Sequence, residues 1–144
     1  MSISAFTLKD QNDQDVSFAA LKGQKFLLSF HPLAWTSVCA KQMQDLESMY
    51  DQFKARAITP FGVSIDHLYS KKAWADSLGL TKLQLLADFW PHGALAEALC
   101  CFIPKAGMSG RSNFLIGGDG EVIWSKRHEI KEQPDFKAIL AEMP

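Results

Sequence analysis

Apolar and polar residues follow one another along the chain in patterns that predict a series of strands and helices. The run from Phe26 to Phe30 is nearly continuous in apolar residues, which is typical of a central strand covered on both faces. From Val38 to Phe53, apolar residues recur three and four positions apart with polar residues between them. This spacing predicts an amphipathic helix that runs to about Lys54. We expect Thr36 or Ser37 to cap its start, because a hydroxyl there can accept a bond from a free helix N–H.

The rest of the sequence continues this alternation of strand and helix patterns. Strands are expected at residues 6–8 and 16–18, which form a hairpin, and at 57–65, 83–87, 113–116 and 121–125. Helices are expected at 68–78 with Asp66 as cap, at 93–99 with Pro91 in the first turn, and after Pro134, with one helical turn at 19–23. Strands that alternate with helices predict an α/β fold, a mixed central sheet flanked by helices with an N-terminal hairpin.

Length, composition and charge narrow the class of protein. The 144 residues, 47% of them hydrophobic, fit one domain that spans residues 1–144 and builds its own core. The net charge of −1 leaves no basic excess to hold nucleic acid or an anionic membrane surface, so neither partner is expected. No segment has the pattern of a signal peptide or the length of a membrane span, and we interpret the protein as cytoplasmic.

The cysteines and histidines point away from disulfide and metal sites. Three cysteines, an odd number in such a chain, argue against a disulfide framework and for at least one free thiol. The sequence has no Cys-x-x-Cys pair, which disfavours both a disulfide oxidoreductase and a zinc site. His67, His92 and His128 lack the spacing of metal ligands. We therefore expect no metal site.

Cys39 is the candidate nucleophile. It falls in the first turn of the helix predicted after Pro32, where the positive end of the helix favours a thiolate over a thiol. A thiolate so placed can attack an electrophile. From position alone, an inert buried cysteine that packs as a small apolar side chain stays the simpler alternative.

The residues around Cys39 carry a resemblance to a known family. The pattern Pro32-x-x-x-Thr36-x-x-Cys39 resembles the active-site signature of the peroxiredoxin (AhpC/TSA) family of thiol peroxidases. Further similar segments occur in the family's order, at Phe6–Asp10, Gly62–Asp66, Trp74 and Arg111–Ile116. Pro32–Thr36 and Asp88–Ala94 are most similar to the AhpE-type, one-cysteine subgroup. The resemblance implies a thioredoxin-like version of the predicted α/β fold.

The resemblance also implies a role for each residue of the motif. Cys39 would attack hydrogen peroxide or a small organic hydroperoxide and become a sulfenic acid. Arg111 would stabilise the thiolate and donate hydrogen bonds to the peroxide. Thr36 would donate a hydroxyl hydrogen bond to a peroxide oxygen, and Pro32 would shield the thiolate from water. Without the family pattern, Arg111 would read as a solvated cation at a strand end.

Two supporting positions depart from the family. Gln42 stands where many members carry a glutamate that binds the arginine, and its carbonyl can accept the same bond without adding negative charge. We expect a looser Arg111 and a better stabilised thiolate. His31 replaces a tyrosine often seen before the motif proline, and we expect a packed ring with a satisfied nitrogen, although a histidine here could also tune Cys39.

Reduction of the sulfenic acid needs a second thiol. Position 44 is glutamine, so a resolving cysteine found there in one subgroup is absent. This favours an external thiol reductant of the thioredoxin, glutaredoxin or low-molecular-weight-thiol type. Cys100 and Cys101 are possible resolving residues, but we expect one of them to face the core and the other the solvent, because neighbouring cysteines rarely bond to each other.

Other functions remain open at the level of the sequence. A redox sensor or binding protein on the same fold would be oxidised once without turnover. A Cys–His hydrolase would need a histidine base within hydrogen-bonding reach of Cys39. Exposed Trp35, Phe89 and Trp90 would supply the apolar contact of a homodimer, the assembly that the resemblance implies.

Overall fold

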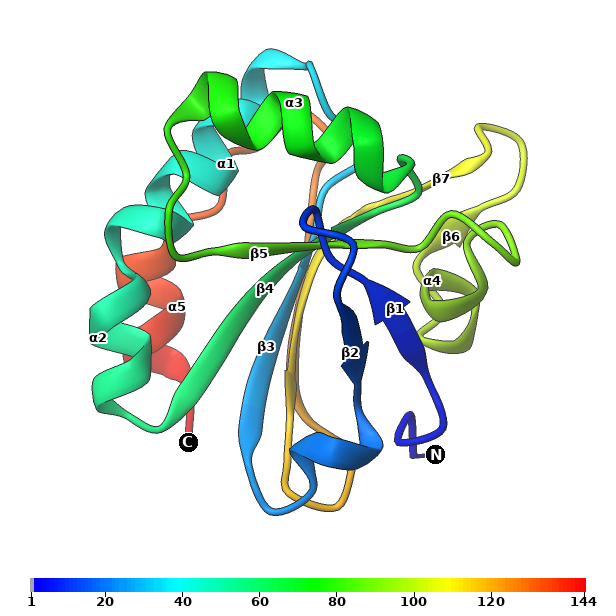
Figure 1. Cartoon of the computed structure of the whole chain (residues 1–144). Coiled ribbons are helices and arrows are strands. Elements are labelled where there is room, and N and C mark those ends of the chain that lie inside the picture. Colours follow the sequence, from blue (N-terminus) through cyan, green and yellow to red (C-terminus); the bar gives the residue numbers. More distant parts are fainter. Residues whose placement is uncertain (1) are drawn as a thin grey trace.

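A seven-stranded mixed sheet runs through the molecule (Figure 1). The computed structural model describes residues 2–144. The strand order is β2-β1-β5-β4-β3-β8-β9, and β3, β4 and β5 are parallel to one another. The strands are β1 (Thr7–Lys9), β2 (Asp15–Ser17), β3 (Lys25–Phe30), β4 (Ile58–Ser64), β5 (Gln84–Ala87), β8 (Arg111–Ile116) and β9 (Val122–His128). A separate pair is formed by β6 (Phe102–Ile103) and β7 (Met108–Ser109). The central position predicted for residues 26–30 is confirmed, because β3 lies between β4 and β8.

Helices cover both faces of the sheet and complete the predicted architecture. They are η1 (Ala19–Leu21), α1 (Ser37–Ser48), α2 (Tyr50–Ala55), α3 (Leu68–Leu78), α4 (Ala94–Ala98) and α5 (Phe136–Glu142). The first three α-helices and α5 share one apolar core on one face, whereas α4 and the N-terminal hairpin share a second core on the other. Among residues 2–144, no helix has both the length and the apolar character needed to cross a bilayer.

The parallel strands end at one edge of the sheet, and the candidate residues Pro32, Thr36 and Cys39 follow the end of β3 at this edge. Backbone bonds extend the ladder beyond the strands, since His31 N donates to Val63 O at 2.9 Å and Asp88 N donates to Ser64 O at 2.8 Å. Helix α1 starts close to this edge, after the turn at Pro32. The carboxyl ends of parallel strands are the common position of functional residues in open α/β sheets.

The long helix expected to run to about Lys54 is two helices, so that prediction was wrong. The chain leaves helical geometry at Met49, with φ −98° and ψ 4°, and α2 follows. The Ser48 hydroxyl donates to the Asp45 carbonyl at 2.7 Å, which the Met49 N–H also uses at 3.1 Å. Such a local side-chain bond competes with continuation of the helix.

The helix expected at 68–78 is confirmed, but its predicted cap is wrong. It ends at Gly79, whose φ of +72° suits a left-handed C-cap. Its N-cap is His67, whose Nδ1 accepts from Tyr69 N at 3.1 Å. The Asp66 carboxylate instead accepts bonds from Ala34 N and Ser64 Oγ, at 2.9 and 2.6 Å.

Pro91 does not lie in the first turn of α4, which corrects a further expectation. It follows a cis Trp90–Pro91 bond, and α4 begins at Ala94 after Gly93 in left-handed geometry. The start of α4 is held by the Asp88 carboxylate, which accepts from Leu95 N and Ala96 N at 2.9 Å each. Burial raises the pKa of this carboxyl, and the two backbone bonds oppose the rise.

Candidate active site

Cys39 lies in the first turn of α1 with its side chain completely buried. Thr36 is the N-cap residue with extended geometry, so the predicted start of the helix is confirmed. The predicted capping bond is wrong: within the described chain no helix N–H donates to the Thr36 hydroxyl, which itself donates to Leu33 O at 2.8 Å. The free N–H groups at this end of the helix therefore favour negative charge on Cys39.

Arg111 is the first residue of β8, and the fold places it beside Cys39, although the two residues are 72 positions apart in the chain. Its Nη1 donates to Cys39 Sγ at 3.3 Å and to Gln42 Oε1 at 2.6 Å. Its Nε and Nη2 donate to the Ile130 carbonyl at 3.0 and 2.7 Å. Arg111 is only 3% exposed, so its charge acts on the thiol with little screening by solvent.

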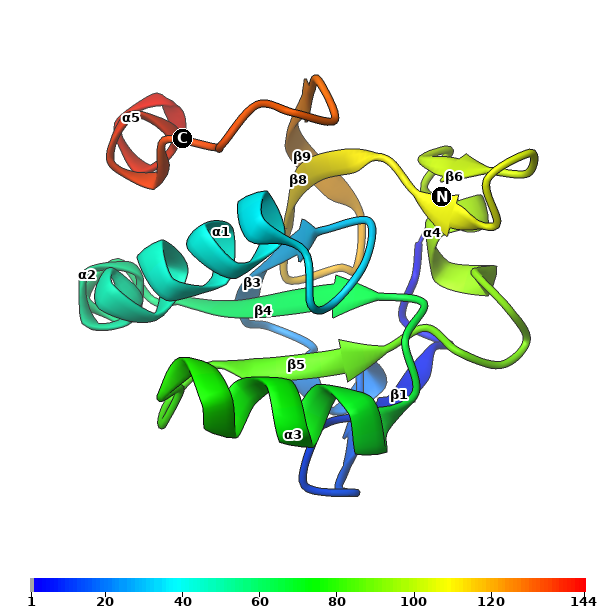
Figure 2. The same ribbon diagram turned by 90° about the horizontal axis from the view of Figure 1, so that it is seen from above.

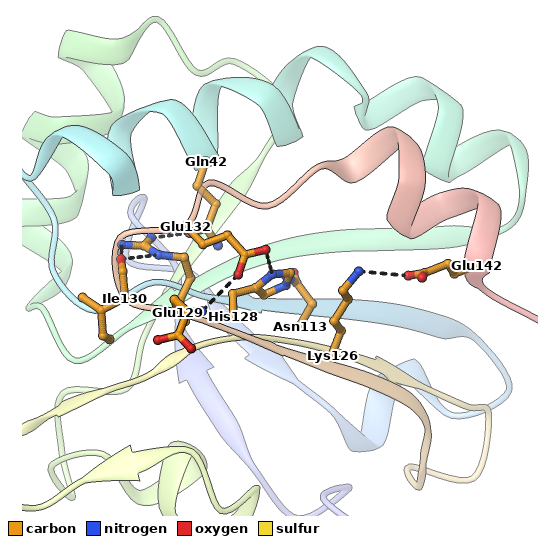
Figure 3. A network of polar contacts seen from close by, with 9 residues as sticks. Gln42, Asn113, Lys126, His128, Glu129, Ile130, Glu132 and Glu142 are labelled. Atoms are coloured by element: carbon orange, nitrogen blue, oxygen red, sulfur yellow. Dashed lines mark hydrogen bonds and ion pairs between the residues drawn. The ribbon is translucent and has the colours of Figure 1, made fainter.

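Gln42 holds the arginine through one end of its amide and the sheet through the other. Its Nε2 donates to Ser29 Oγ at 2.8 Å and to the Phe30 carbonyl at 3.2 Å. Figure 3 shows Gln42 pointing from α1 toward the sheet, and Ile130 approaching the same place from the segment after β9. Four hydrogen bonds fix the Arg111 guanidinium, so Gln42 holds it without a carboxylate, and the expected difference from a glutamate at this position stays a prediction.

The carbonyl of Ile130 is itself held in place by a polar network on β8 and β9 (Figure 3). His128 contacts Asn113 Nδ2 through Nε2 at 3.0 Å and Glu132 Oε2 through Nδ1 at 3.4 Å. Glu132 also accepts from Glu129 N at 3.1 Å, and the bonds from Glu129 and His128 lower the pKa of this carboxyl. The segment that binds Arg111 is thus anchored on both sides of Ile130.

The remaining motif residues lie around Cys39 without bonding to it. Pro32 is buried in the turn before α1, whereas Thr36 is exposed at the end of the helix. In residues 2–144 the Thr36 hydroxyl bonds to Leu33 O rather than to Cys39. The structure thus brings Arg111 into direct contact with both Cys39 and Gln42, whereas Pro32 and Thr36 lie in the segment that leads from β3 into α1.

His31 is fully buried, and its ring packs 5.2 Å from the ring of Trp74. Neither ring nitrogen has a hydrogen-bond partner among the described residues, so the expectation of a satisfied nitrogen is wrong. Burial holds the pKa of His31 well below its usual value, and the positive charges of Lys71 and Arg111 lower it further. His31 is therefore a neutral ring at neutral pH.

Cys100 and Cys101 lie in different environments, one exposed and one buried, as expected. Cys101 is buried, and burial raises the pKa of its thiol to about 12. Cys100 is exposed, with φ +60°. Both line a surface hollow of about 400 Å³ that also reaches Arg111 and His128. At neutral pH Cys101 is a protonated and therefore poor nucleophile.

No histidine in the described residues forms a hydrogen bond with Cys39. His67 binds Tyr69 N, His92 binds Gly107 O, and His128 binds Asn113 and Glu132. The site thus lacks the base that the Cys–His hydrolase hypothesis requires. Its place beside the sulfur is taken by Arg111, which cannot act as a base because it stays protonated.

Comparison with known proteins identifies the family. The model of the AhpC/TSA family matches residues 2–125. The chain belongs to this family. Over 142 residues it is 34% identical to alkyl hydroperoxide reductase E of Mycobacterium tuberculosis (strain ATCC 25618 / H37Rv), which covers 96% of this chain and 92% of that protein. The resemblance to AhpE-type peroxiredoxins is thereby confirmed, and the chain is a thiol-dependent peroxidase.

Solved structures confirm the thioredoxin-like fold of this peroxiredoxin. Enterococcus faecalis AhpC superimposes with a TM-score of 0.87 at 23% identity, covering 99% of this chain and 89% of that chain. The reduced 2-Cys peroxiredoxin of Plasmodium vivax gives a TM-score of 0.85 at 23% identity, covering 94% of this chain and 74% of that chain. The shared architecture is the mixed sheet with helices on both faces.

Two features of the peroxiredoxin site were missed by the sequence reasoning. The Ile130 carbonyl is a backbone group, so no side-chain pattern marks it. Lys71 is fully buried on α3, three residues before the buried Trp74. This spacing places both on one helix face and could have revealed the lysine as a buried residue.

Proposed function

We propose that Cys39 is the nucleophile with which this peroxiredoxin reduces hydrogen peroxide or small organic hydroperoxides. The observation that carries the proposal is the 3.3 Å contact between Arg111 Nη1 and Cys39 Sγ, both of which belong to buried residues. A fixed guanidinium at this distance stabilises a thiolate. Its hydrogen bonds to the sulfur are stronger than those of a neutral donor, because the guanidinium is charged. The helix N-terminus adds to the same effect.

The reaction follows from the position of these groups. The thiolate attacks the distal peroxide oxygen, an S–O bond forms as the O–O bond breaks, and the leaving oxygen takes up a proton to give water or an alcohol. Negative charge moves from sulfur to oxygen, and Arg111 is placed to stabilise both ends of this path. Thr36 can donate to the peroxide once its hydroxyl turns from Leu33 O, and Pro32 excludes water.

The sulfenic acid then needs a reductant, for which we propose an external thiol of the thioredoxin, glutaredoxin or low-molecular-weight-thiol type in the cytoplasm. Complete burial of Cys39 means that the first turn of α1 must open before a thiol can reach the sulfur. Cys101 is protonated and buried, and Cys100 faces solvent. These properties favour a one-cysteine cycle over internal resolution.

An exposed aromatic surface supports assembly into a homodimer. Trp35, Tyr69, Phe89 and Trp90 are 57, 73, 44 and 81% exposed. The Trp35 indole bonds to Ser70 Oγ at 2.9 Å, and the His67 ring contacts those of Tyr69 and Phe89, so the surface is continuous. Sedimentation velocity should detect a dimer that Trp35→Ser/Trp90→Ser weakens, and a monomer across the tested concentrations would contradict this assembly.

The test of the proposed function is intact mass after one equivalent of hydrogen peroxide with a sulfenic-acid trap. Wild type and Cys100→Ser/Cys101→Ser should both carry the trap on Cys39, and Cys39→Ser should neither carry it nor consume peroxide. Peroxide consumption by Cys39→Ser would overturn the proposal. Loss of two hydrogens without trapping in wild type alone would assign resolution to Cys100 or Cys101.

One observation favours a second candidate, a redox sensor that is oxidised once. The burial of Cys39 slows any external thiol. Repeated turnover with a general thiol reductant distinguishes the two functions, because a sensor would stop after one equivalent of peroxide whereas the peroxidase continues.

A further inference from the structure

Lys71 is a buried cation that the mechanism above leaves unused. Its side chain has 0% exposure, and its Nζ has no hydrogen-bond partner among residues 2–144. An unpartnered amine in a protein interior costs about 1–3 kcal/mol, and a charged one costs more. A methionine would fill similar space without this cost, so the position of Lys71 calls for a functional reason.

The surroundings of Lys71 connect it to the catalytic pocket. Lys71 lies on α3, which packs against β5, while Arg111 belongs to β8, and β4 and β3 lie between these strands. In the view of Figure 2, α1 with Cys39 lies between α3 and β8. Trp74, one helical turn after Lys71, shares the buried core cluster of Cys39. Lys71 therefore borders the apolar core that contains Cys39 on the side of α3, whereas Arg111 reaches the sulfur from β8.

The charged and titratable groups around Lys71 come from four segments. Asp66 follows β4, Asp88 follows β5, Cys39 lies on α1, and His31 follows β3. Neither carboxylate hydrogen-bonds to Lys71, because Asp66 binds Ala34 N and Ser64 Oγ, and Asp88 binds the start of α4. Lys71 is thus not committed to an ion pair.

We propose that Lys71 is a second cation that stabilises the Cys39 thiolate, acting as a positioning residue alongside Arg111. The proposal rests on Cys39 being the nucleophile. In the low dielectric of the core, a unit charge acts over longer distances than in water, so direct contact is not required. Lys71 supports the thiolate only while it carries its proton.

The pH range of this effect follows from the burial of the amine. Burial lowers the pKa of Lys71 to about 7, while Asp66, Asp88 and the Cys39 sulfur oppose the drop. His31 stays neutral in the same range, because its own pKa is held far lower. Lys71 is therefore charged below pH 7 and loses its charge above it, while Arg111 remains charged throughout.

The linkage is reciprocal and gives two independent readouts. If the ammonium stabilises the thiolate, the thiolate stabilises the ammonium by the same free energy. Removing the lysine charge should make the thiolate harder to form, and removing the thiolate should make Lys71 lose its proton at lower pH. A residue that only fills space would produce neither shift.

The first experiment compares Lys71→Met with Lys72→Met, a matched control. Lys72 is the next residue of α3, but it is exposed and paired with Asp76 at 3.1 Å. We expect the rate of Cys39 oxidation by hydrogen peroxide at pH 6 to fall about threefold to tenfold in Lys71→Met, which corresponds to a loss of about 0.7–1.4 kcal/mol of thiolate stabilisation. The profiles should converge at pH 9, and Lys72→Met should follow wild type. Superimposable profiles for Lys71→Met and wild type would overturn the proposal.

The second experiment does not depend on the folding of the lysine variant or on peroxidase activity. Lysine Cε shifts, followed by carbon-13 NMR in wild type and Cys39→Ser, report the titration of the buried Lys71 amine directly. Its midpoint should move to lower pH in Cys39→Ser. Equal midpoints would refute the coupling even if Cys39 proves to be the nucleophile, whereas a shift would uphold the coupling even if peroxide consumption were not lost in Cys39→Ser.

Discussion

The two cationic groups around Cys39 are held in opposite ways. Arg111 makes four hydrogen bonds, and its acceptors are fixed by further bonds on α1, β3 and the segment after β9. Lys71 is equally buried but makes none among the described residues, and it lies near His31, which is also unpartnered. The difference teaches that a buried cation can be built for permanence or for titration. A guanidinium stays charged at any pH at which the protein is folded, and its hydrogen bonds fix its position, whereas desolvation without partners makes the charge of a lysine depend on pH.

Removal of Arg111 should produce the largest effect, and it tests the role of the cation whose charge does not change with pH. Arg111→Met deletes the bond to Cys39 Sγ and leaves the Gln42 and Ile130 acceptors buried and unpaired. Loss of one such charged donor costs about a hundredfold to a thousandfold in rate. Stopped-flow measurement of Cys39 oxidation by hydrogen peroxide checks this. Arg127→Met, on the exposed neighbouring strand, is the control, and a loss of less than tenfold in Arg111→Met would contradict the assigned role.

Because the charge of Lys71 depends on pH, Lys71→Met should stabilise the fold at low pH. In the native state the pKa of Lys71 is about 7, below the 10.5 of an ordinary lysine. Between pH 7 and 10.5 the unfolded chain binds a proton at Lys71 that the native protein does not bind. The free energy of unfolding therefore rises with pH across this range. Below pH 7 both states are protonated, and the full cost of the buried charge destabilises the native protein. We expect Lys71→Met to raise the free energy of unfolding at pH 6 by about 2–4 kcal/mol.

Urea unfolding at pH 6, 7, 8 and 9 measures this effect. The gap between Lys71→Met and wild type should narrow steadily as the pH rises, and Lys72→Met should show no such trend. A constant gap at every pH would mean that Lys71 acts through packing alone, and the contrast with Arg111 would then fail.

A smaller effect is expected from Gln42→Glu, which alters the support of Arg111 without removing it. The Gln42 amide donates to the Phe30 carbonyl at 3.2 Å, and a carboxylate would instead face that oxygen with repulsion. The added negative charge would also disfavour the thiolate. We expect about 1–2 kcal/mol lower stability and a rate lower by about threefold to tenfold.

Gln44→Glu is the control for this change, since it adds the same charge at an exposed position of α1. Both variants are compared by urea unfolding and by the rate of Cys39 oxidation. If Gln42→Glu matched wild type in both, the amide would be interchangeable with the glutamate of other family members.

Several properties of this peroxiredoxin could be read from the sequence alone. The apolar run of β3, the period of α1 and the glycine that ends α3 are local patterns, and each specifies an element through its own residues. The motif around Cys39 identified the family, because those residues stand close together along the chain. The separation of Cys100 at the surface from Cys101 in the core was also expected.

The tertiary structure decided what depends on which groups meet. It placed Arg111 against Cys39 across 72 positions, and it gave the cap of α3 to His67 because Asp66 is held by Ala34 and Ser64. A helical period can mark Lys71 as buried, but it cannot show that no acceptor reaches its amine. Desolvation and hydrogen bonding are set by the complete packed environment, and they determine at which pH the Lys71 amine keeps its proton.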